Sequence, residues 1–425
     1  MVNEINLVSL GNTNIQFIDG DRGKNYPQKT DFYKNGYCVF LNTGNVKPDG
    51  FDFSDLYYIT QEKDEILNKG RVQLNDIVLT TRGTVGNVAI FDDQVPFKKI
   101  RINSGMVIIR CSNRFYPYFL YSFFRSSLFK SQCGLNGSGS AQPQLPISAI
   151  KNIKIPEFNL KTQQSIAAVL SALDKKIALN KQINTRLEEM AKTLYDYWFV
   201  QFDFPDANGK PYKSSGGEMV FDETLKREIP KGWEVKSLGE IALTSSGGTP
   251  TSTVQEYYKG GNIPWINSGE LNNNFIVYTD NFITQTGMDN SSAKLVSEKS
   301  ILLAMYGATA GKTSLISFKT TTNQAICSIL PKDMNYRVYI KSYLDNMYLY
   351  LVQLSSGSAR DNLSQDKIKR LHLVIPESGI LEIFSNVTED FYKKIENNLK
   401  QNYHLTQIRD FLLPMLMNGQ VSVAE

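Results

Sequence analysis

The feature that most constrains this chain is an internal repeat spanning most of each half. The segment GSGSAQPQLPISAIKNIKIP (137–156) resembles SSGSARDNLSQDKIKRLHLVIP (355–376), and Gly139 and Gly357 lie 218 positions apart. Lys175 and Lys393 keep this offset, whereas matches nearer the start of each half drift to offsets of 225 and 228. The repeat predicts two copies of one structural unit, each a divergent module followed by a more uniform tail.

The tail of each half predicts a long helix with a coiled-coil seam. Mostly apolar residues recur at alternating steps of four and three from Ile166 to Trp198, and the same spacing runs from Phe384 to Leu416. Both seams are interrupted by Asn at matching positions. These positions are Asn180, Asn184, Asn398 and Asn402.

The matching Asn positions predict that the two helices are partners. A buried Asn in a seam costs stability and fixes the register of pairing. Antiparallel pairing about the seam centres places Asn180 opposite Asn402 and Asn184 opposite Asn398, so that their amides can hydrogen-bond. Two unrelated amphipathic helices are the alternative interpretation.

Each half opens with a module of mixed α and β character. The expected fold class is therefore α+β: two mixed α/β modules separated by two long helices that pair as an antiparallel coiled coil, with a pseudo-two-fold internal repeat. Short β-rich runs bounded by Gly, Asn or Asp predict strands, and one aromatic-rich stretch per module predicts a helix. The expected strands are 38–42, 76–81, 88–91, 106–111, 301–306, 313–318 and 325–330, and the expected helices are 117–133 and 339–354.

A Pro/Gly/Ser/Lys stretch, PDANGKPYKSSGGE (205–218), lies between the halves and predicts an exposed linker. It completes the expected division of the chain. The predicted domains are 1–158 for the first module, 159–204 for the first helical spacer, 205–229 for the linker, 230–377 for the second module and 378–425 for the second helical spacer.

Composition excludes several classes of protein. The 46 Lys and Arg against 42 Asp and Glu give a net charge of +4, which permits an anionic partner without requiring one. The start, MVNEINLVSL, lacks the pattern of a signal peptide. No apolar run reaches the roughly 18 residues that a membrane helix needs. We therefore expect a cytoplasmic protein.

The sequence lacks recognisable catalytic or metal-binding motifs. The four Cys are scattered without a C-x-x-C pair and only two His are present, so we expect no metal and no cofactor on this chain. GATAGKT (307–313) has three residues where a phosphate-binding loop has four, so it and TRGTVGN (81–87) predict hairpins instead. His372 is expected in a strand, and His404 on a solvated flank of the second helix.

What remains is a pair of binding modules. Their loops are rich in Arg, Lys, Asn, Gln and Tyr, which contact phosphates and read base edges. Any one such residue also fits a solvated surface position, and only the set indicates nucleic acid. Gln142 and Arg360 hold equivalent places in the repeat but differ chemically, as expected if the modules read different bases. The DNA-binding candidates are Arg22, Lys24, Tyr26, Arg82, Arg101, Gln142, Tyr306, Lys312, Arg360 and Asn362.

Five motifs together give the chain a family resemblance. They are PKGWEVKSLGEI (230–241), PWINSGELNN (264–273), LLAMYGATAGK (302–312), LYDYWFVQFDFP (194–205) and IRDFLLPMLMNGQ (408–420). Over essentially its whole length the chain resembles the specificity subunits of Type I restriction–modification systems. The first module departs from the pattern, because it lacks a Gly-Trp-Glu opening and begins almost directly at its first strand.

The resemblance implies a non-catalytic subunit with two target-recognition domains, each reading one part of an interrupted, asymmetric DNA site. It implies that the helices fix the spacing between the parts and dock methyltransferase subunits, two in number. Those partners transfer a methyl group from S-adenosylmethionine to adenine. A restriction subunit, which uses ATP and Mg, joins for cleavage.

Two other classes of protein stay open at this point. One is a self-contained DNA methyltransferase, which methyl transfer by the purified chain would reveal. The other is a coiled-coil scaffold whose modules bind protein or glycan. A salt-dependent gel shift on random-sequence DNA separates that scaffold from a DNA-binding protein.

Overall fold

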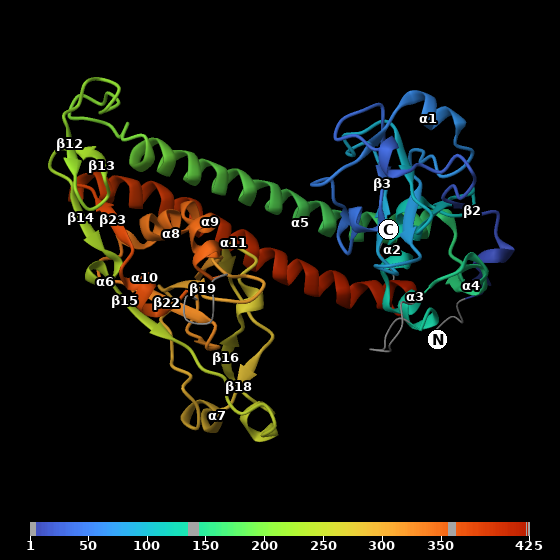
Figure 1. The fold of residues 1–425 in the computed structure, drawn as a ribbon. Helices are drawn as coiled ribbons and strands as arrows, with labels where there is room; N and C mark the ends of the chain where they lie inside the picture. The colour runs from blue at the N-terminus through green and yellow to red at the C-terminus, as the bar shows by residue number, and fades with distance from the viewer. Residues whose placement is uncertain (1–5, 135–143, 356–362, 422, 424–425) are drawn as a thin grey trace. The chain divides into compact units, whose positions relative to one another are not determined.

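The computed structural model describes residues 6–134, 144–355, 363–421 and 423 (Figure 1). The chain forms two compact units. The first unit is 1–177 with 404–425, and the second unit is 178–403. Each long helix therefore contributes one part to each unit, whereas the predicted domain boundaries treat the helices as regions of their own.

The first unit is built on a four-stranded antiparallel sheet in the order β2-β10-β7-β8. A second sheet, β6-β3-β9, pairs β3 antiparallel to β6 and parallel to β9. A short hairpin, β4-β5, accompanies them. The strands are β2 (Gln16–Asp19), β3 (Cys38–Leu41), β4 (Val46–Lys47), β5 (Gly50–Phe51), β6 (Tyr58–Ile59), β7 (Ile77–Thr80), β8 (Val88–Ile90), β9 (Ile100–Ile102) and β10 (Met106–Arg110).

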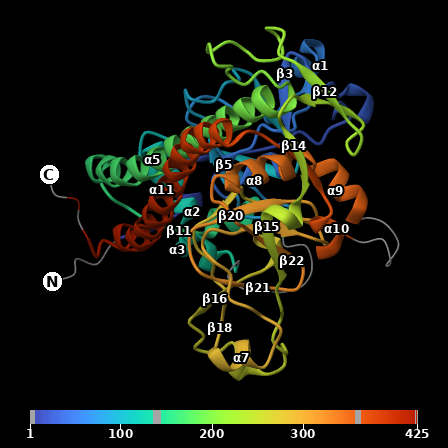
Figure 2. The ribbon, with the colours of Figure 1, turned by 90° about the vertical axis from the view of Figure 1, so that its left-hand side faces the viewer.

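The second unit repeats this strand order and adds one strand, β17, which pairs parallel with β20. Its main sheet has the order β15-β22-β19-β20-β17, and its smaller sheet is β18-β16-β21, with β16 parallel to β21. In Figures 1 and 2 the smaller sheet and helix α7 (Gln285–Asp289) form the end of this unit away from α11. The strands are β15 (Ala242–Ser246), β16 (Ile263–Ile266), β17 (Phe275–Ile276), β18 (Phe282–Ile283), β19 (Ile301–Ala304), β20 (Thr313–Ile316), β21 (Thr321–Thr322) and β22 (Ile326–Pro331).

Both main sheets are buried on their two faces. In the first unit, Ile77 and Leu79 of β7 enter one apolar cluster and Val78 enters another. In the second, Leu303 and Leu302 of β19 divide between two clusters in the same way. Successive side chains of a strand point to opposite faces, so runs of apolar residues here mark strands covered on both sides.

A two-stranded antiparallel ribbon closes the edge of each module. β1 (Leu7–Ser9) pairs with β11 (Lys154–Pro156), and β14 (Glu234–Ser237) pairs with β23 (His372–Ile375). The first module therefore closes its amino-terminal edge in the same way as the second, although it lacks the Gly-Trp-Glu opening. His372 lies in a strand, as predicted.

The expected aromatic-rich helices are present, but each is broken into two. The predicted helix 117–133 is α2 (Pro117–Arg125) followed by α3 (Ser127–Gln132), because Ser126 leaves helical geometry and its hydroxyl caps the second piece. The predicted helix 339–354 is α8 (Tyr336–Asn346) followed by α9 (Tyr348–Ser355). Shorter helices are α1 (Gln61–Ile66), α4 (Ile147–Asn152), α6 (Leu238–Ile241) and α10 (Gln365–Lys369).

The two long predicted helices are α5 (Leu160–Tyr195), which continues into a π-helical turn over Asp196–Val200, and α11 (Ser378–Met417). Their ends are built into the module cores. The end of α11 supplies Leu413, Leu416 and Met417 to the core of the first unit. The end of α5 and the π-helical turn after it supply Ala191, Tyr195 and Trp198 to the core of the second.

The predicted linker is exposed but ordered. Residues 219–222 and 227–230 form the hairpin β12-β13 (Met219–Asp222 and Arg227–Pro230). Ahead of it, the ring of Tyr212 stacks on Phe204 with centroids 4.7 Å apart, and Phe204 stacks on Trp233 at 4.6 Å. The segment between the halves is therefore a packed attachment of the second unit. Among the described residues no helix has the length and apolar character that crossing a membrane requires.

Candidate nucleic-acid interface

In the first unit the loop joining β7 to β8 (81–87) is tied to two neighbouring turns. The backbone amides of Thr81 and Arg82 donate to the carbonyl of Gly105 over 2.8 and 3.2 Å. The hydroxyl of Thr84 donates to the carbonyl of Thr43 over 3.1 Å. Gly83 adopts a φ of +71°, a conformation that favours glycine. We call this loop and the turns at 42–45 and 103–105 the first tip junction.

The first tip junction brings together two of the predicted DNA-binding residues. Arg22 donates from Nη2 to the carbonyl of Ser104 over 3.3 Å, one residue before the carbonyl that holds Arg82. Arg82 is exposed, and the side chain of Arg22 is half exposed but forms an ion pair with Asp19 at 3.0 Å. Of the two guanidinium groups, Arg82 is therefore the better placed for a phosphate or a base edge.

Three further candidates of the first unit are Lys24, Tyr26 and Gln142. Lys24 is exposed. Tyr26 is half-buried with its ring edge-on to Phe40 at a centroid distance of 5.9 Å, so much of its side chain is used in packing. Gln142 lies outside the described residues. Leu145, near the start of the next described segment, contacts the junction. Its amide donates to the carbonyl of Thr81 over 3.0 Å.

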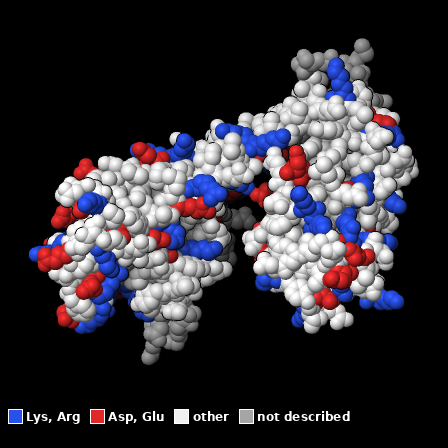
Figure 3. Space-filling model, turned by 90° about the horizontal axis from the view of Figure 1, so that it is seen from above, with Lys and Arg blue, Asp and Glu red and all other residues white. Residues whose placement is uncertain are grey.

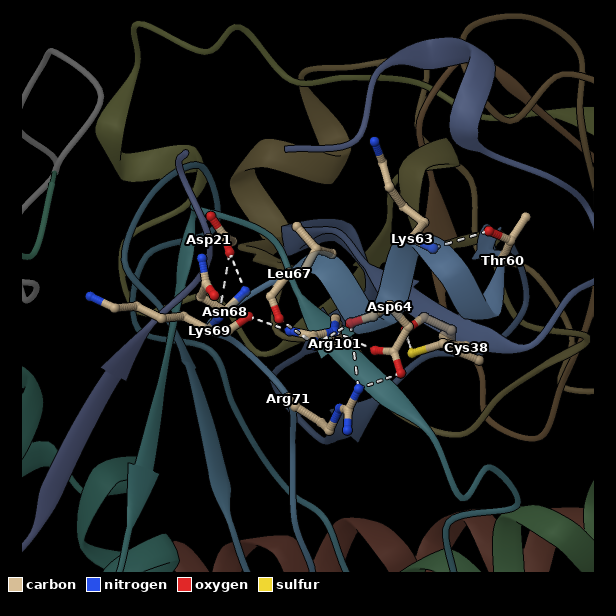
Figure 4. Close-up of polar contacts among 11 residues, drawn as sticks. Asp21, Cys38, Thr60, Lys63, Asp64, Leu67, Asn68, Lys69, Arg71 and Arg101 are labelled. Carbon is tan, nitrogen blue, oxygen red and sulfur yellow. Dashed lines mark hydrogen bonds and ion pairs between the residues drawn. The ribbon is translucent and has the colours of Figure 1, made fainter. Parts of the chain in front are cut away.

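Arg101 corrects the sequence-based assignment. Its side chain is 3% exposed, because β9 is covered on both sides. The guanidinium forms an ion pair with the carboxylate of Asp64 and donates to the carbonyls of Lys69 at 2.6 Å and Leu67 at 2.9 Å (Figure 4). Arg71 contacts the other carboxylate oxygen of Asp64 at 2.5 Å. Arg101 is a buried structural residue, and its donors are not available to DNA.

Asp21 provides a second fixed point next to this cluster. Its carboxylate accepts the amides of Gly23 at 2.9 Å and Asn68 at 2.8 Å (Figure 4). The hydrogen bond from Gly23 is the largest influence that lowers the pKa of Asp21. The loop carrying Arg22 and Lys24 is thus held against the segment that carries the partners of Arg101.

The second unit builds the same junction with different exposed side chains. The amide of Met305 donates to the carbonyl of Ala325 over 2.8 Å, and the hydroxyl of Thr309 donates to the carbonyl of Ser268 over 2.8 Å. We call the loop 305–312 with the turns at 267–270 and 323–325 the second tip junction. Tyr306, 38% exposed, lies on it where the first junction carries Arg82. The strands flanking both loops pair antiparallel, so the predicted hairpins are confirmed.

The remaining candidates of the second unit have mixed outcomes. Lys312 is half-buried and donates from Nζ to Asn272 Oδ1 over 2.7 Å, so part of its hydrogen-bonding capacity is used within the protein. Arg360 and Asn362 lie outside the described residues.

Two turns in these junctions were not identified as parts of a site from the sequence. Asn45 Oδ1 accepts the amide of Asn42 over 3.0 Å, and Glu270 Oε1 accepts the amide of Asn267 over 2.9 Å. Each of these side chains closes a 3-10 turn. A hydroxyl of the neighbouring hairpin loop, from Thr84 or Thr309, donates to a carbonyl of that turn. The sequence signal is the match of LNTG (41–44) to INSG (266–269) at the offset of 225, which marks the repeat without marking a site.

The four seam asparagines meet within the second unit. Asn180 donates from Nδ2 to Asn402 Oδ1 over 2.9 Å and to Gln401 Oε1 over 2.7 Å. Asn398 donates from Nδ2 to Asn184 Oδ1 over 2.8 Å. Within the first unit, the same two helices are joined by an ion pair of 2.9 Å between Asp174 and Arg409.

The described residues contain no group of His, Cys, Asp and Glu side chains arranged to hold a metal ion. The four cysteines are free thiols. On the face shown in Figure 3, basic and acidic side chains are interspersed, in keeping with the small net charge of +4. Any anion-binding surface here therefore depends on local loop residues rather than on a field of one sign.

By fold and site, the chain is a two-module binding protein in which each compact unit presents one junction of the same design. Comparison with known families makes this specific. The Type I restriction modification DNA specificity domain matches residues 15–189 and again 230–401. The chain therefore belongs to the family of Type I restriction–modification specificity subunits, whose general role is recognition of a DNA target.

Individual relatives agree with the family match. The chain is 30% identical to the Type I restriction enzyme MjaIX specificity subunit of Methanocaldococcus jannaschii, over 82% of this chain and 78% of that protein. It is 28% identical to the HindI specificity subunit of Haemophilus influenzae, over 95% and 98%. The crystal structure of a Type I S subunit from M. genitalium shares the fold, with a TM-score of 0.59 and 16% identity over 98% and 97% of the chains.

Proposed function

We propose that this chain is the DNA-specificity subunit of a Type I restriction–modification complex and that each unit reads one part of an interrupted, asymmetric site. The observation that carries the proposal is the duplicated tip junction. Each family-domain match contains one junction, held by equivalent bonds but carrying Arg82 in one unit and Tyr306 in the other. One scaffold with different exposed side chains suits two modules that recognise different bases.

In this proposal the junctions make the primary contacts with the duplex. The exposed guanidinium of Arg82 can fork onto O6 and N7 of a guanine or bind a phosphate, while Arg22 and Lys24 suit backbone contact. Gln142, Arg360 and Asn362 remain candidates for base contact on chemical grounds, because amide and guanidinium groups suit base edges. Arg101 is excluded by its burial.

The long helices are proposed to pair as an antiparallel coiled coil that sets the distance between the two parts of the site. The asparagine hydrogen bonds within the second unit and the Asp174–Arg409 ion pair within the first support this pairing. Antiparallel pairing of two equivalent helices also fits a pseudo-two-fold arrangement of the repeat.

The subunit is proposed to be non-catalytic and to work through partners. The helices dock two methyltransferase subunits, which bind S-adenosylmethionine, and a restriction subunit with ATP and Mg joins the assembly for cleavage. The chain itself needs no cofactor in this scheme.

The test is to map methyladenine by single-molecule sequencing in host DNA with and without this gene. We expect one bipartite, asymmetric motif to lose its methylation when the gene is deleted. Retention of every methylated motif, or loss of a motif that is not bipartite, contradicts the proposal. Purified chain free of partners should transfer no radiolabelled methyl group, and transfer would favour the self-contained methyltransferase.

A further inference from the structure

The second unit contains a cavity of about 530 Å³ that the proposed DNA contacts do not use. It lies between the end of α5, the junction of α8 with α9, and one residue of α11. Its lining includes the carboxylates of Glu188, Glu189, Asp196 and Asp345 and the rings of Tyr195, Tyr348 and Tyr392. Four carboxylates and three tyrosines on one cavity wall are a composition suited to an organic cation.

Three of the four carboxylates already have partners. Asp345 is paired with the fully buried Lys341, and Asp196 is paired with Lys192. Glu189 is paired with Arg186 at 2.8 Å. Glu188 has no ion-pair partner among the described residues. Burial raises the pKa of Glu188, with a hydrogen bond to Asn274 opposing the change. The cavity thus holds one partly buried carboxylate outside any ion pair among the described residues. The charge of Lys341 also opposes the rise in the pKa of Glu188, but that ammonium is paired with Asp345.

Two tyrosine hydroxyls also lie on the cavity wall. Tyr195 is 4% exposed and Tyr392 is 6% exposed. Neither hydroxyl oxygen is among the fully buried polar atoms of the described residues, so both remain accessible to a group that enters the cavity.

The first unit shows what fills the equivalent place there. Tyr392 and Ala191 correspond, at the repeat offset of 218, to Asp174 and Arg409. In the first unit Asp174 accepts an ion pair from Arg409 at 2.9 Å and another from Arg125 at 2.5 Å. The guanidinium of Arg125 also lies over the ring of Tyr121, 4.9 Å from its centroid. Guanidinium groups thus occupy this position in one unit, beside a carboxylate and a tyrosine.

We infer that the cavity of the second unit is a binding site for a guanidinium group, delivered by an arginine side chain of a partner polypeptide. The planar group pairs with Glu188, offers further N–H donors to the tyrosine oxygens, and stacks on an aromatic face, which an ammonium does less well. Exposed apolar side chains at the entrance of the cavity favour a polypeptide as the source of the guanidinium group. Leu349 is 75% exposed and Tyr348 and Tyr350 are 39% and 48% exposed, so apolar residues flanking the arginine would cover them.

The experiment is isothermal titration of the full chain with the peptide acetyl-Leu-Arg-Leu-amide. The same peptide with citrulline in place of arginine has nearly the same shape but no charge, and agmatine carries a guanidinium without flanking residues. We expect the arginine peptide to bind, the citrulline peptide to bind at least about tenfold more weakly, which is about 1.4 kcal/mol, and agmatine to bind more weakly than the arginine peptide.

Three variants separate this site from a general effect. Glu188→Gln removes the charge and Tyr392→Phe removes one hydroxyl, and both should weaken peptide binding, the first by about tenfold or more. Glu382→Gln changes an exposed carboxylate of α11 outside the cavity and should leave binding unchanged. Circular dichroism of each variant verifies folding.

Equal binding of the arginine and citrulline peptides, or full binding by a folded Glu188→Gln variant, overturns the guanidinium site. Agmatine binding as tightly as the arginine peptide overturns the polypeptide source. Because none of these titrations contains DNA, their failure leaves the proposed DNA-specificity function unaffected.

Discussion

Asn180 and Asn402, which are 222 positions apart in the sequence, are joined by a hydrogen bond of 2.9 Å between buried side-chain amides. Such a pair stabilises one register, because sliding the helices sets each amide against an apolar residue. The Oδ1 of Asn180 has no hydrogen-bond partner among the described residues, so the pair is retained despite one unsatisfied acceptor. Register rather than maximal stability therefore accounts for these asparagines.

The first prediction tests that coupling. Asn402→Leu should lower the free energy of unfolding by about 1–3 kcal/mol, because it removes the partner of a buried amide. The double variant Asn180→Leu/Asn402→Leu should recover part of the loss, since the seam then becomes apolar on both sides. Urea unfolding of the four proteins in the cycle measures the interaction. Additive effects of the two changes would show that the amides are not coupled.

The second prediction concerns Arg82. Arg82→Ala should weaken binding of the partner-loaded complex to its cognate DNA by about 1–3 kcal/mol if the guanidinium reads a guanine. Lys130→Ala, at an exposed position on α3, is a control that should have little effect. Gel shifts on cognate and random DNA measure both. An equal loss on the two DNAs makes Arg82 a phosphate contact, and no loss on either removes it from the interface.

The third prediction separates Arg101 from the DNA-binding residues. Arg101→Met should destabilise the first unit by about 3–5 kcal/mol, because the buried carboxylate of Asp64 loses its main partner. Arg71→Met removes the other partner of Asp64, but that side chain is 54% exposed and should cost under about 1 kcal/mol. Thermal unfolding checks both variants. Similar stability of the two would contradict the structural role of Arg101.

These outcomes show where sequence patterns are informative. The hairpins around 81–87 and 305–312 were predictable, because short β-rich runs bounded by glycine are a local signal. The break between α2 and α3 was signalled locally too, since Ser126 is a good helix-capping residue. The asparagine positions were predictable because the repeat supplied two copies of one helical pattern.

The burial of Arg101 was not predictable from local pattern. Its partner Asp64 lies 37 positions away, and nothing in the sequence links the two. In the same way, the attachment of the ends of α5 and α11 to the module cores depends on contacts between residues that are far apart in the sequence. Leu416 and Trp198 look like ordinary seam residues, yet each is buried in the core of a module.

The fourth prediction concerns the thiols. Burial raises the pKa of Cys38, Cys111 and Cys327 to about 12, and that of Cys133 to about 11. Each value exceeds the unfolded value of 9.0, so the protonated thiols contribute stability that is fully present below pH 9 and is lost as the pH rises toward these values.

At pH 8 the native thiolates should therefore be scarce, and a disulfide reagent should react with native protein about a hundredfold or more slowly than with unfolded protein. Cys133 should react first among the four. Timed titration with Ellman's reagent, with urea-unfolded protein as the control, measures this. A native thiol that reacts as fast as the unfolded chain would refute the prediction.

The last prediction concerns a fragment of residues 1–217. In the intact chain the core of the first unit takes Leu413, Leu416 and Met417 from α11, which the fragment lacks. The fragment carries the repeat equivalents of that segment at the end of α5, including Trp198. A second copy can therefore complete the core if two α5 helices pair antiparallel, which also sets Asn180 opposite Asn184.

The fragment should accordingly form a homodimer, observable by analytical ultracentrifugation. With methyltransferase subunits, this dimer should modify a palindrome built from the first half-site, because both modules are then the same. A fragment carrying Asn180→Asp and Asn184→Asp provides the control. It should dimerise poorly, since antiparallel pairing would bring like charges together in the seam. A fragment that stays strictly monomeric at concentrations of tens of micromolar, or a charged variant that dimerises equally well, would exclude antiparallel self-pairing through these residues.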